Sequence, residues 1–277
     1  MPLSNPDQPI TPLRAVVIAL AALILFVAVQ LITAVISVQL LIRAGVVDRG
    51  ILEQDATRVA SFDMVQVVLL SEIMMGCAFA AVAAVTGVLR TLLDPTDTVW
   101  ALLRLFPLLG IVVGTQVIGS AVTHDPFLAP HITLGRALTL CATAIAIGIA
   151  EELVFRGLMV HGLQRAQMPV LTVTVSAVLF GALHLFDNVV NAVAVTLALA
   201  VPFALVRLRG GSLGALIVVH SVIDIAALLS LGNLDLPDST PPNEAVTQIV
   251  MASIICAAYV LWYRRDVRLV EEQDAMV

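Results

Sequence analysis

Three short motifs place ionisable side chains inside long apolar runs. An ionisable residue at the centre of a membrane helix costs roughly 2.5–3.5 kcal/mol on insertion scales. Carboxylates and imidazoles are also the groups that move protons and bind metal ions in hydrolases. We therefore take these motifs as the candidate site. They read Glu151-Glu152-Leu-Val-Phe-Arg156, Phe180-Gly-Ala-Leu-His184 and His220-Ser-Val-Ile-Asp224.

Helical spacing predicts how some of these groups pair. Glu152 and Arg156 are four residues apart in the favourable order, so we expect them to lie on one helix face and neutralise each other. Glu151 points about 100° away from its neighbour and has no partner on its own helix. It must meet a polar group of another span or take up a proton. His184 and His220 are the candidates, and their convergence with Glu151 would satisfy three costly groups together.

The composition indicates which elements must position these groups. Of the 277 residues, 60% are hydrophobic and 12% are charged, whereas soluble domains are about half apolar and about a quarter charged. A bilayer core about 30 Å thick needs roughly 20 apolar residues per helix. We predict an all-α, polytopic transmembrane helical bundle of about eight spans. The spans are Ala15–Ile42, Met64–Leu89, Trp100–Val122, Leu138–Leu163, Val170–Leu185, Val189–Val206, Leu213–Leu231 and Ala245–Tyr263.

The arginines predict the orientation of the spans. Eight spans place both termini on one side, and cytoplasmic loops carry the excess of Lys and Arg. The side of the termini holds more arginines, although the first loop opposes this trend, so we predict cytoplasmic termini in the cell (plasma) membrane. The arginines on that side are Arg14, Arg90, Arg165, Arg207, Arg209, Arg264, Arg265 and Arg268, and those opposite are Arg43, Arg49, Arg58 and Arg136.

Other features exclude some functions and carry no chemistry of their own. The net charge of −6 and the lack of Lys argue against nucleic acid as a partner. Cys77, Cys141 and Cys256 stand singly in apolar runs, which predicts core packing rather than a thiolate metal site. Glu72 and Arg104 are lone charges within predicted spans, and we expect each to snorkel or to make one interhelical contact.

Taken in order on successive spans, the three motifs resemble the CAAX-protease and bacteriocin-processing (CPBP, Abi-type) family of intramembrane proteases. Any one motif is weak, but all three in order are a strong signal. The resemblance covers about Ile149 to Asp224 and leaves the first three spans and the last one uncovered. It implies a protease-like core at about 138–231 within a transmembrane helical domain at 14–264, flanked by cytoplasmic tails at 1–13 and 265–277.

The resemblance also implies an activity and roles for the residues. The enzyme would be a CAAX-prenyl-protease-like endopeptidase that cleaves a membrane-associated peptide or a prenylated or lipidated protein in the lipid bilayer. Glu151 and His184 would activate a water molecule, while His220 and the residue at 224 would stabilise the oxyanion. The supporting residues would be Glu152, Arg156 and Phe180.

Two points of this mechanism stay open in the sequence. Asp224 stands where the prenyl-protein endopeptidase branch has Asn, and an ionised Asp can only accept hydrogen bonds. Asp224 must therefore be protonated, orient His220 or bind a metal. Glu151, His184 and His220 would suit Zn²⁺ with an open fourth position, but no HExxH helix specifies such a site.

Two functions other than proteolysis are also compatible with the motifs. A non-catalytic membrane scaffold or a bacteriocin-immunity-type protein would use the polar cluster only to hold helices together. Intramembrane Glu, His and Asp also mark ion pathways in transporters. The transporter ranks last, because the cluster occupies one part of the chain and no inverted repeat is apparent.

Overall fold

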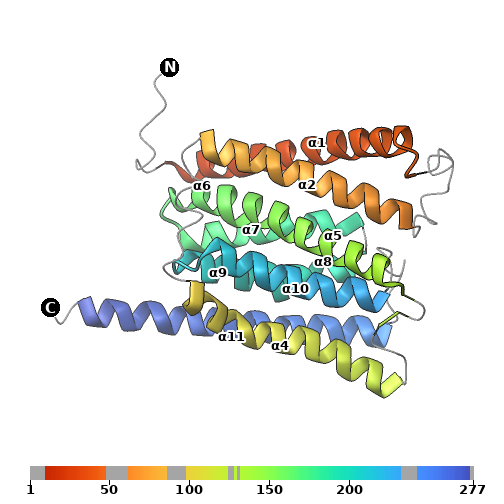
Figure 1. Ribbon diagram of the computed structural model, residues 1–277. Helices are drawn as coiled ribbons and strands as arrows, with labels where there is room; N and C mark the ends of the chain where they lie inside the picture. Colours follow the sequence, from red (N-terminus) through yellow and green to blue (C-terminus); the bar gives the residue numbers. More distant parts are fainter. Residues whose placement is uncertain are drawn as a thin grey trace. The chain divides into compact units, whose positions relative to one another are not determined.

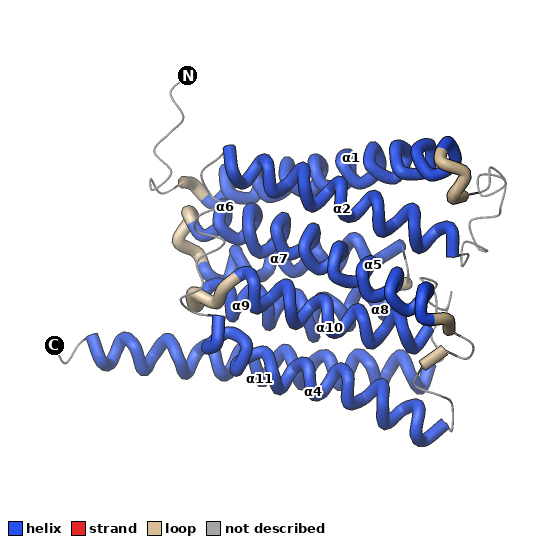
Figure 2. The backbone as a smooth tube through the Cα atoms, in the orientation of Figure 1, coloured by secondary structure: helices blue, strands red, loops and turns tan. Residues whose placement is uncertain are grey.

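A computed structural model of the chain describes residues 10–47, 62–85, 98–123, 128–129, 132–186, 188–231 and 242–274. Helices account for nearly all of these residues, and no strand occurs among them (Figures 1 and 2). The predicted all-α fold is confirmed. The helices are α1 (Pro12–Arg43), α2 (Phe62–Val85), α4 (Thr98–Thr123), α5 (Leu134–Glu152), α6 (Val160–Gln164), α7 (Pro169–Leu183), α8 (Val189–Val195), α9 (Val201–Leu208), α10 (Leu213–Leu231) and α11 (Pro242–Asp274); the π-helices η3 (Leu153–Met159) and η5 (Thr196–Ala200) and the 3-10 turn η4 (His184–Phe186) interrupt them.

Among the described residues, seven helical segments are long and apolar enough to cross a membrane. Two of them run through a π-helical turn, namely Leu134–Gln164 and Val189–Leu208. The eighth apolar helix, Pro169–Leu183, is shorter, and it corresponds to the predicted span Val170–Leu185. The chain is therefore an integral, multi-pass membrane protein, as predicted. The end of one predicted span, Thr86–Leu89, and the predicted loop charges Arg49, Arg58 and Arg90 lie outside the described residues.

The chain divides into two compact units. Unit 1 comprises Met1–Ala19, Met159–Gly211 and Pro237–Val277, and unit 2 comprises Leu20–Leu158 and Ser212–Leu236.

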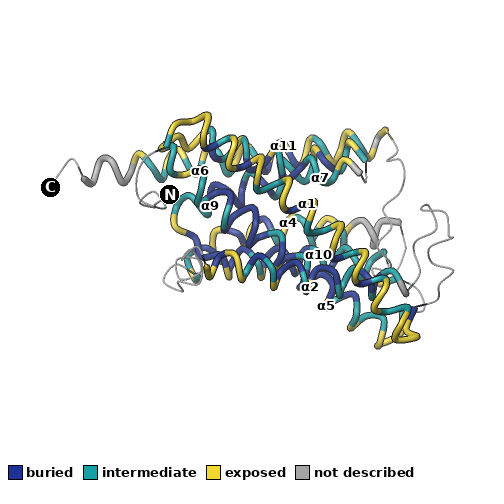
Figure 3. Tube along the Cα trace, turned by 90° about the horizontal axis from the view of Figure 1, so that it is seen from above, coloured by how far each residue is buried: buried dark blue, intermediate teal, exposed yellow. Residues whose placement is uncertain are grey.

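The helices of unit 2 pack around α5, which contacts α2 on one side and α10 on another, while α10 also contacts α4. Three buried rings from α1, α2 and η3 form part of its core: Phe26 stacks on Phe79 at 6.0 Å and meets Phe155 edge-on at 5.5 Å. Polar contacts also join α1 to α2, including a hydrogen bond of 2.9 Å between the hydroxyl groups of Thr33 and Ser71. Buried positions lie along α5 and α10, whereas much of α1 is exposed and apolar, as a lipid-facing helix requires (Figure 3).

In unit 1, α7 packs on η5 and α9, and α11 packs on α8, η5 and α9. Gly181 of α7 has no room for a Cβ, because a Cβ there would overlap the hydroxyl group of Thr196. Arg209 donates a hydrogen bond of 2.7 Å from Nε to Oδ2 of Asp266, and this ion pair fastens α11 to the end of α9.

Candidate active site

The most buried part of the candidate site is a carboxylate shared by a guanidinium group and an imidazole ring. Oε1 of Glu152 accepts a hydrogen bond of 2.8 Å from Nη1 of Arg156 and lies 2.8 Å from Nδ1 of His220. The side chains of Glu152 and Arg156 are at most 1% exposed, and His220 is 4% exposed. A buried ion pair needs such hydrogen bonds to offset the loss of hydration. The predicted pairing of Glu152 with Arg156 is present, and His220 is a second partner that helical spacing could not reveal.

Two further carboxylates face the other nitrogen of the same imidazole. Nε2 of His220 lies 3.7 Å from Oε2 of Glu151 and 3.5 Å from Oδ2 of Asp224, which is one turn along α10. Glu151 and Asp224 are 15% and 23% exposed, so they are the more accessible members of the group. A histidine with a carboxylate at each nitrogen can donate on both sides only as the imidazolium. The group is therefore strongly polar, with three carboxylates around one imidazole and one guanidinium.

A glycine and a change of helix type explain how α5 and α10 bring these residues together. A Cβ at Gly148 would lie 2.5 Å from Oγ and 3.2 Å from the backbone N of Ser221, so only glycine fits this close crossing. His220 is the residue next to that contact, and Glu152 is one turn beyond Gly148. The π-helix η3 begins directly after Glu152, and π-helical turns are frequent at functional sites.

The remaining motif lies in unit 1. Phe180 is buried in α7, and His184 follows the end of that helix, with its ring 5.3 Å from the ring of Phe180. The one-turn spacing therefore brings these two side chains together as expected. The structure gathers Glu151, Glu152, Arg156, His220 and Asp224 within unit 2, whereas the pairing of His184 with Glu151 would join the two units and stays a prediction.

Glu72 and Cys77 lie outside the three motifs, and the structure shows where each side chain is placed. Glu72 makes the expected interhelical contact, because its Oε1 accepts a hydrogen bond of 2.7 Å from Nε2 of Gln30 in α1. Cys77 is exposed rather than packed in a core, so that prediction is wrong for this cysteine. A lipid-facing residue and a core residue both have apolar neighbours in the sequence. The hydropathy of the sequence therefore cannot distinguish the two positions.

Within the described residues, no group of three or more His, Cys, Asp or Glu side chains is arranged to hold a metal ion. Nδ1 of His220 is engaged by Glu152, which leaves Nε2 for any further ligand. The predicted Zn²⁺ ligands are divided between the units, with Glu151 and His220 in one and His184 in the other. Zinc ligation by these three residues stays a prediction.

A family model described as type II CAAX prenyl endopeptidase Rce1-like matches residues 133–226, about a third of the chain. The matched segment contains all three motifs and ends two residues after Asp224. The chain carries a CPBP-family domain. This finding confirms the family that the motifs predicted, and it supports a CAAX-type intramembrane protease. No curated protein and no solved structure gave a significant match.

The Rce1-like segment coincides with the helices that carry the polar motifs. It begins one residue before α5 and ends within α10, so it includes α7 and both π-helices. Helices α1, α2 and α4 precede it, and α11 follows it. Glu72 and Gln30 therefore lie outside the CPBP-family domain, although α2 packs directly on α5.

Proposed function

We propose that this protein is an intramembrane endopeptidase that hydrolyses a peptide bond of a membrane-associated peptide or of a prenylated protein. The observation that carries the proposal is the convergence of Glu151 and Asp224 on Nε2 of His220, within the segment that matches the Rce1-like family. Carboxylates and an imidazole held close together supply both a base and a hydrogen-bond donor.

Glu151 is the proposed general base. It is the more accessible of the two adjacent glutamates, and it has no salt-bridge partner on its own helix. Its carboxylate takes a proton from a water molecule, and the resulting hydroxide attacks the peptide carbonyl carbon. His184 orients the water in this scheme. When the tetrahedral intermediate collapses, the C–N bond breaks and the proton held by Glu151 passes to the leaving amine.

His220 is the proposed donor to the oxyanion, and two carboxylates position it. Glu152 holds Nδ1, which points the Nε2–H group away from the buried ion pair and toward Glu151 and Asp224. An ionised Asp224 orients this N–H group rather than donating to the oxyanion itself. Preorganised donors of this kind contribute about 2.7–4 kcal/mol to the stabilisation of charged intermediates in other hydrolases.

This mechanism uses only side chains, and metal dependence is a separate part of the proposal. If Zn²⁺ participates, it would polarise the carbonyl and lower the pKa of the attacking water. The residues offered for it are Glu151, His184 and His220. Loss of activity on dialysis against a chelator, with recovery on adding Zn²⁺ back, would support this role.

We also propose a membrane and an orientation for the enzyme. We place the enzyme in the plasma membrane with both termini in the cytoplasm, on the basis of the arginine distribution. A reporter fused to each terminus, active only in the cytoplasm, tests this orientation. Activity of only one of the two fusions would contradict it.

The central test compares wild type with Glu151→Gln and His184→Ala in membranes that contain a farnesylated peptide ending in a CAAX sequence. Products are identified by mass spectrometry, and the same membranes are surveyed for endogenous membrane peptides. We expect wild type to cleave the probe or endogenous peptides, and each variant to lose the cleavage while staying inserted. Full activity in either folded variant would contradict the mechanism.

A scaffold or immunity-type protein is the second candidate, and the internal pairing of the cluster favours it. Glu152 binds both Arg156 and His220 through Oε1 in the interior of unit 2, as a purely structural tie between α5 and α10 would. This reading predicts that Glu151→Gln and His184→Ala leave the membrane peptides unchanged, whereas Arg156→Met lowers thermal stability and partner capture together.

A further inference from the structure

One face of α11 in unit 1 is an exposed apolar stripe that runs along a candidate membrane span. The stripe contains Val250, Ile254 and Leu261, which are exposed and lie four and seven residues apart. That spacing places them on one side of the helix. The buried residues Ala252 and Ile255 lie on another side, and α11 packs on α8, η5 and α9. In a bilayer the stripe therefore contacts lipid acyl chains.

Arg264, Arg265 and Arg268 continue this stripe beyond the apolar run. At 100° per residue they lie within about 60° of its last apolar residue around the helix. All three are exposed, and no ion pair or hydrogen bond joins them to a described side chain. Asp266, the one acidic residue among them, lies about 140° away around the helix. It pairs with Arg209 of α9, so the charge at the end of the stripe is positive.

The depth of these arginines matches the layer of lipid head groups. Tyr259, Trp262 and Tyr263 precede them, and aromatic side chains of this kind mark the membrane–water interface. At a rise of about 1.5 Å per residue, Arg264 and Arg268 lie about 1.5 and 7.5 Å beyond Tyr263. The head-group region on each side of a bilayer is about 5–7.5 Å thick. The arginines therefore extend through the layer that contains the lipid phosphates.

The acidic residues near the end of the chain lie further from the membrane. Helix α11 continues to Asp274, and Glu271 is the first acidic position after the arginines. It lies about 12 Å along the helix from Tyr263, which is more than the thickness of the head-group layer. Salt and water screen charges at that distance from the phosphates. The helix thus places positive charge within the head-group layer and negative charge outside it.

We propose that this end of α11 binds anionic phospholipids. Their acyl chains lie along the stripe from Val250 to Leu261, and their phosphate groups pair with the guanidinium groups of Arg264, Arg265 and Arg268. Arginine holds phosphate through parallel N–H donors. This binding does not depend on the proposed proteolysis, and it applies to whichever leaflet contains this end of the helix.

The chemistry of the surface distinguishes an anionic lipid from other sources of phosphate. A zwitterionic lipid also presents a phosphate, but its own ammonium group competes with the arginines for it. A free phosphate ion would have to lose hydration to enter this layer, which is costly for a charged group. The lipids that cover the stripe already carry their phosphates at the depth of the arginines.

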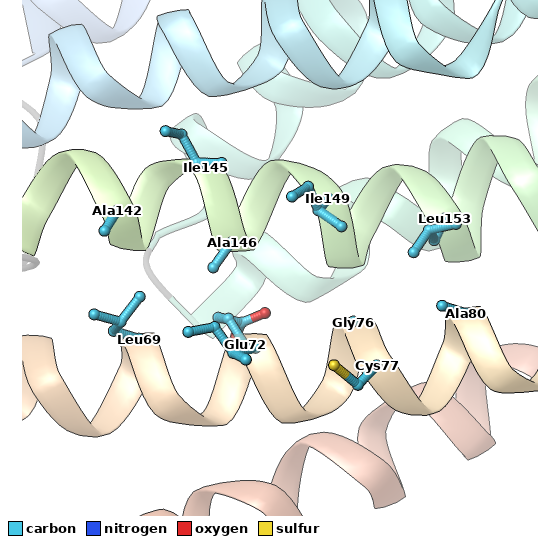
Figure 4. Close-up of a pocket in the computed structure, with 11 residues that line it drawn as sticks. Leu69, Glu72, Gly76, Cys77, Ala80, Ala142, Ile145, Ala146, Ile149 and Leu153 are labelled. Carbon is cyan, nitrogen blue, oxygen red and sulfur yellow. The ribbon is translucent and has the colours of Figure 1, made fainter. Parts of the chain in front are cut away.

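The groove between α2 and α5 in unit 2 is an apolar surface of a different kind (Figure 4). It has a volume of about 460 Å³, and no cationic side chain occurs among its described lining residues. Glu72 is its one charged lining residue, and its carboxyl group accepts a hydrogen bond from Gln30. Acyl chains can fill such a groove whatever the charge of their head groups. We therefore expect anionic lipids to gather at the end of α11 and not at this groove.

Trp262 gives a direct readout, because the chain has two tryptophans and Trp100→Phe leaves only the one that lies a turn before Arg265. The Trp100→Phe protein is reconstituted in vesicles of phosphatidylglycerol with an excess of phosphatidylcholine. Either the phosphatidylglycerol or an equal amount of the phosphatidylcholine carries bromine near the head-group end of its acyl chains. Bromine quenches tryptophan fluorescence on contact, so the quenching reports which lipid lies beside Trp262.

We expect phosphatidylglycerol to have an apparent affinity for this position about fivefold that of phosphatidylcholine, which is the factor that about one arginine contributes near a charged surface. Replacing Arg264, Arg265 and Arg268 together by Gln should remove the preference. Replacing them by Lys should keep most of it, because the charges remain. Arg43→Gln, at the exposed end of α1, is the matched control and should leave the preference unchanged.

Equal quenching by the two brominated lipids in the Trp100→Phe protein would overturn the proposal, and so would a preference that survives in the folded triple Gln variant. Thermal unfolding in detergent shows whether that variant is folded. If it is not, salt decides: concentrated sodium chloride should abolish the preference, and a preference that persists would reject the contact between arginine and phosphate. Sodium phosphate that abolishes the preference at an ionic strength at which sodium chloride does not would assign the arginines to free phosphate, which also overturns the proposal.

Discussion

The two sides of α5 show two ways of holding a carboxylate inside a membrane protein. Toward α10, Glu152 shares Oε1 between Arg156 and His220, and all three side chains are buried. Toward α2, Glu72 is also buried but receives one hydrogen bond from the neutral amide of Gln30. The first region balances charge with charge and the second does not, although in both glutamates Oε2 has no hydrogen-bond partner among the described residues.

This difference predicts how much each carboxyl group contributes to stability. A buried carboxylate with two charge-assisted partners stabilises one arrangement of its helices and positions His220. A buried carboxylate with one neutral partner contributes less to the fold. Substitutions in the two regions should therefore differ in their effects on stability.

The largest loss of stability should come from Arg156→Met. This change removes a fully buried cation. Of the two partners described above for Glu152, it leaves only His220. Breaking a buried ion pair costs about 3–5 kcal/mol, which thermal and chemical unfolding in detergent would measure. Arg104→Met is the control, because Arg104 is exposed and lies 5.7 Å from the Trp100 ring. Similar losses from both variants would contradict the assigned role of Arg156.

Glu152→Gln should separate positioning from catalysis when it is compared with Glu151→Gln. The first change weakens two charge-assisted hydrogen bonds, so we expect a loss of about 2 kcal/mol and a misplaced His220. The second should change stability by less than about 1 kcal/mol and abolish cleavage. Unfolding and cleavage assays are run on the same preparations. A larger destabilisation by Glu151→Gln would reverse the two roles.

Gly148→Ala should cost less than the charge changes and still disturb the site. The added methyl group meets Ser221, so the hydroxyl group of Ser221 must move and the backbone of α10 must give way by a few tenths of an ångström. Overpacking typically costs about 1–3 kcal/mol, and the better helix propensity of Ala recovers up to about 1 kcal/mol. Gly114→Ala is the matched control, since it gains the propensity without a contact. Equal stabilisation by both changes would show that α5 and α10 do not cross closely at Gly148.

The smallest change in stability should follow Glu72→Gln. The amide oxygen can still accept from Gln30, so we expect a loss of less than about 1 kcal/mol. The measurement is the same unfolding transition in detergent. If Glu72→Gln proved as destabilising as Glu152→Gln, the contrast between the two sides of α5 would fail, because Glu72 would then be a structural tie as well.

Some of the contacts between residues of the candidate site could be predicted from the sequence. Glu152 and Arg156 are four residues apart on one helix, and so are His220 and Asp224, and both contacts are present. Such pairs depend only on the repeat of the α-helix. The contact of His220 with Glu152 depends on the register of α5 against α10, to which the sequence pattern gives no access. The predicted contact of His184 with Glu151 depends on tertiary arrangement in the same way.

The sequence by itself determined that this chain is a helical membrane protein with a CPBP-family domain. Long apolar runs must become helices in lipid, because each backbone polar group needs a partner within its own segment. Tertiary structure alone decided that Gly148 permits a close crossing, that Cys77 is exposed, and that a groove lies between α2 and α5. The physical reason is that core and lipid are both apolar, so hydropathy places a helix in the membrane without selecting the face it presents to its neighbours.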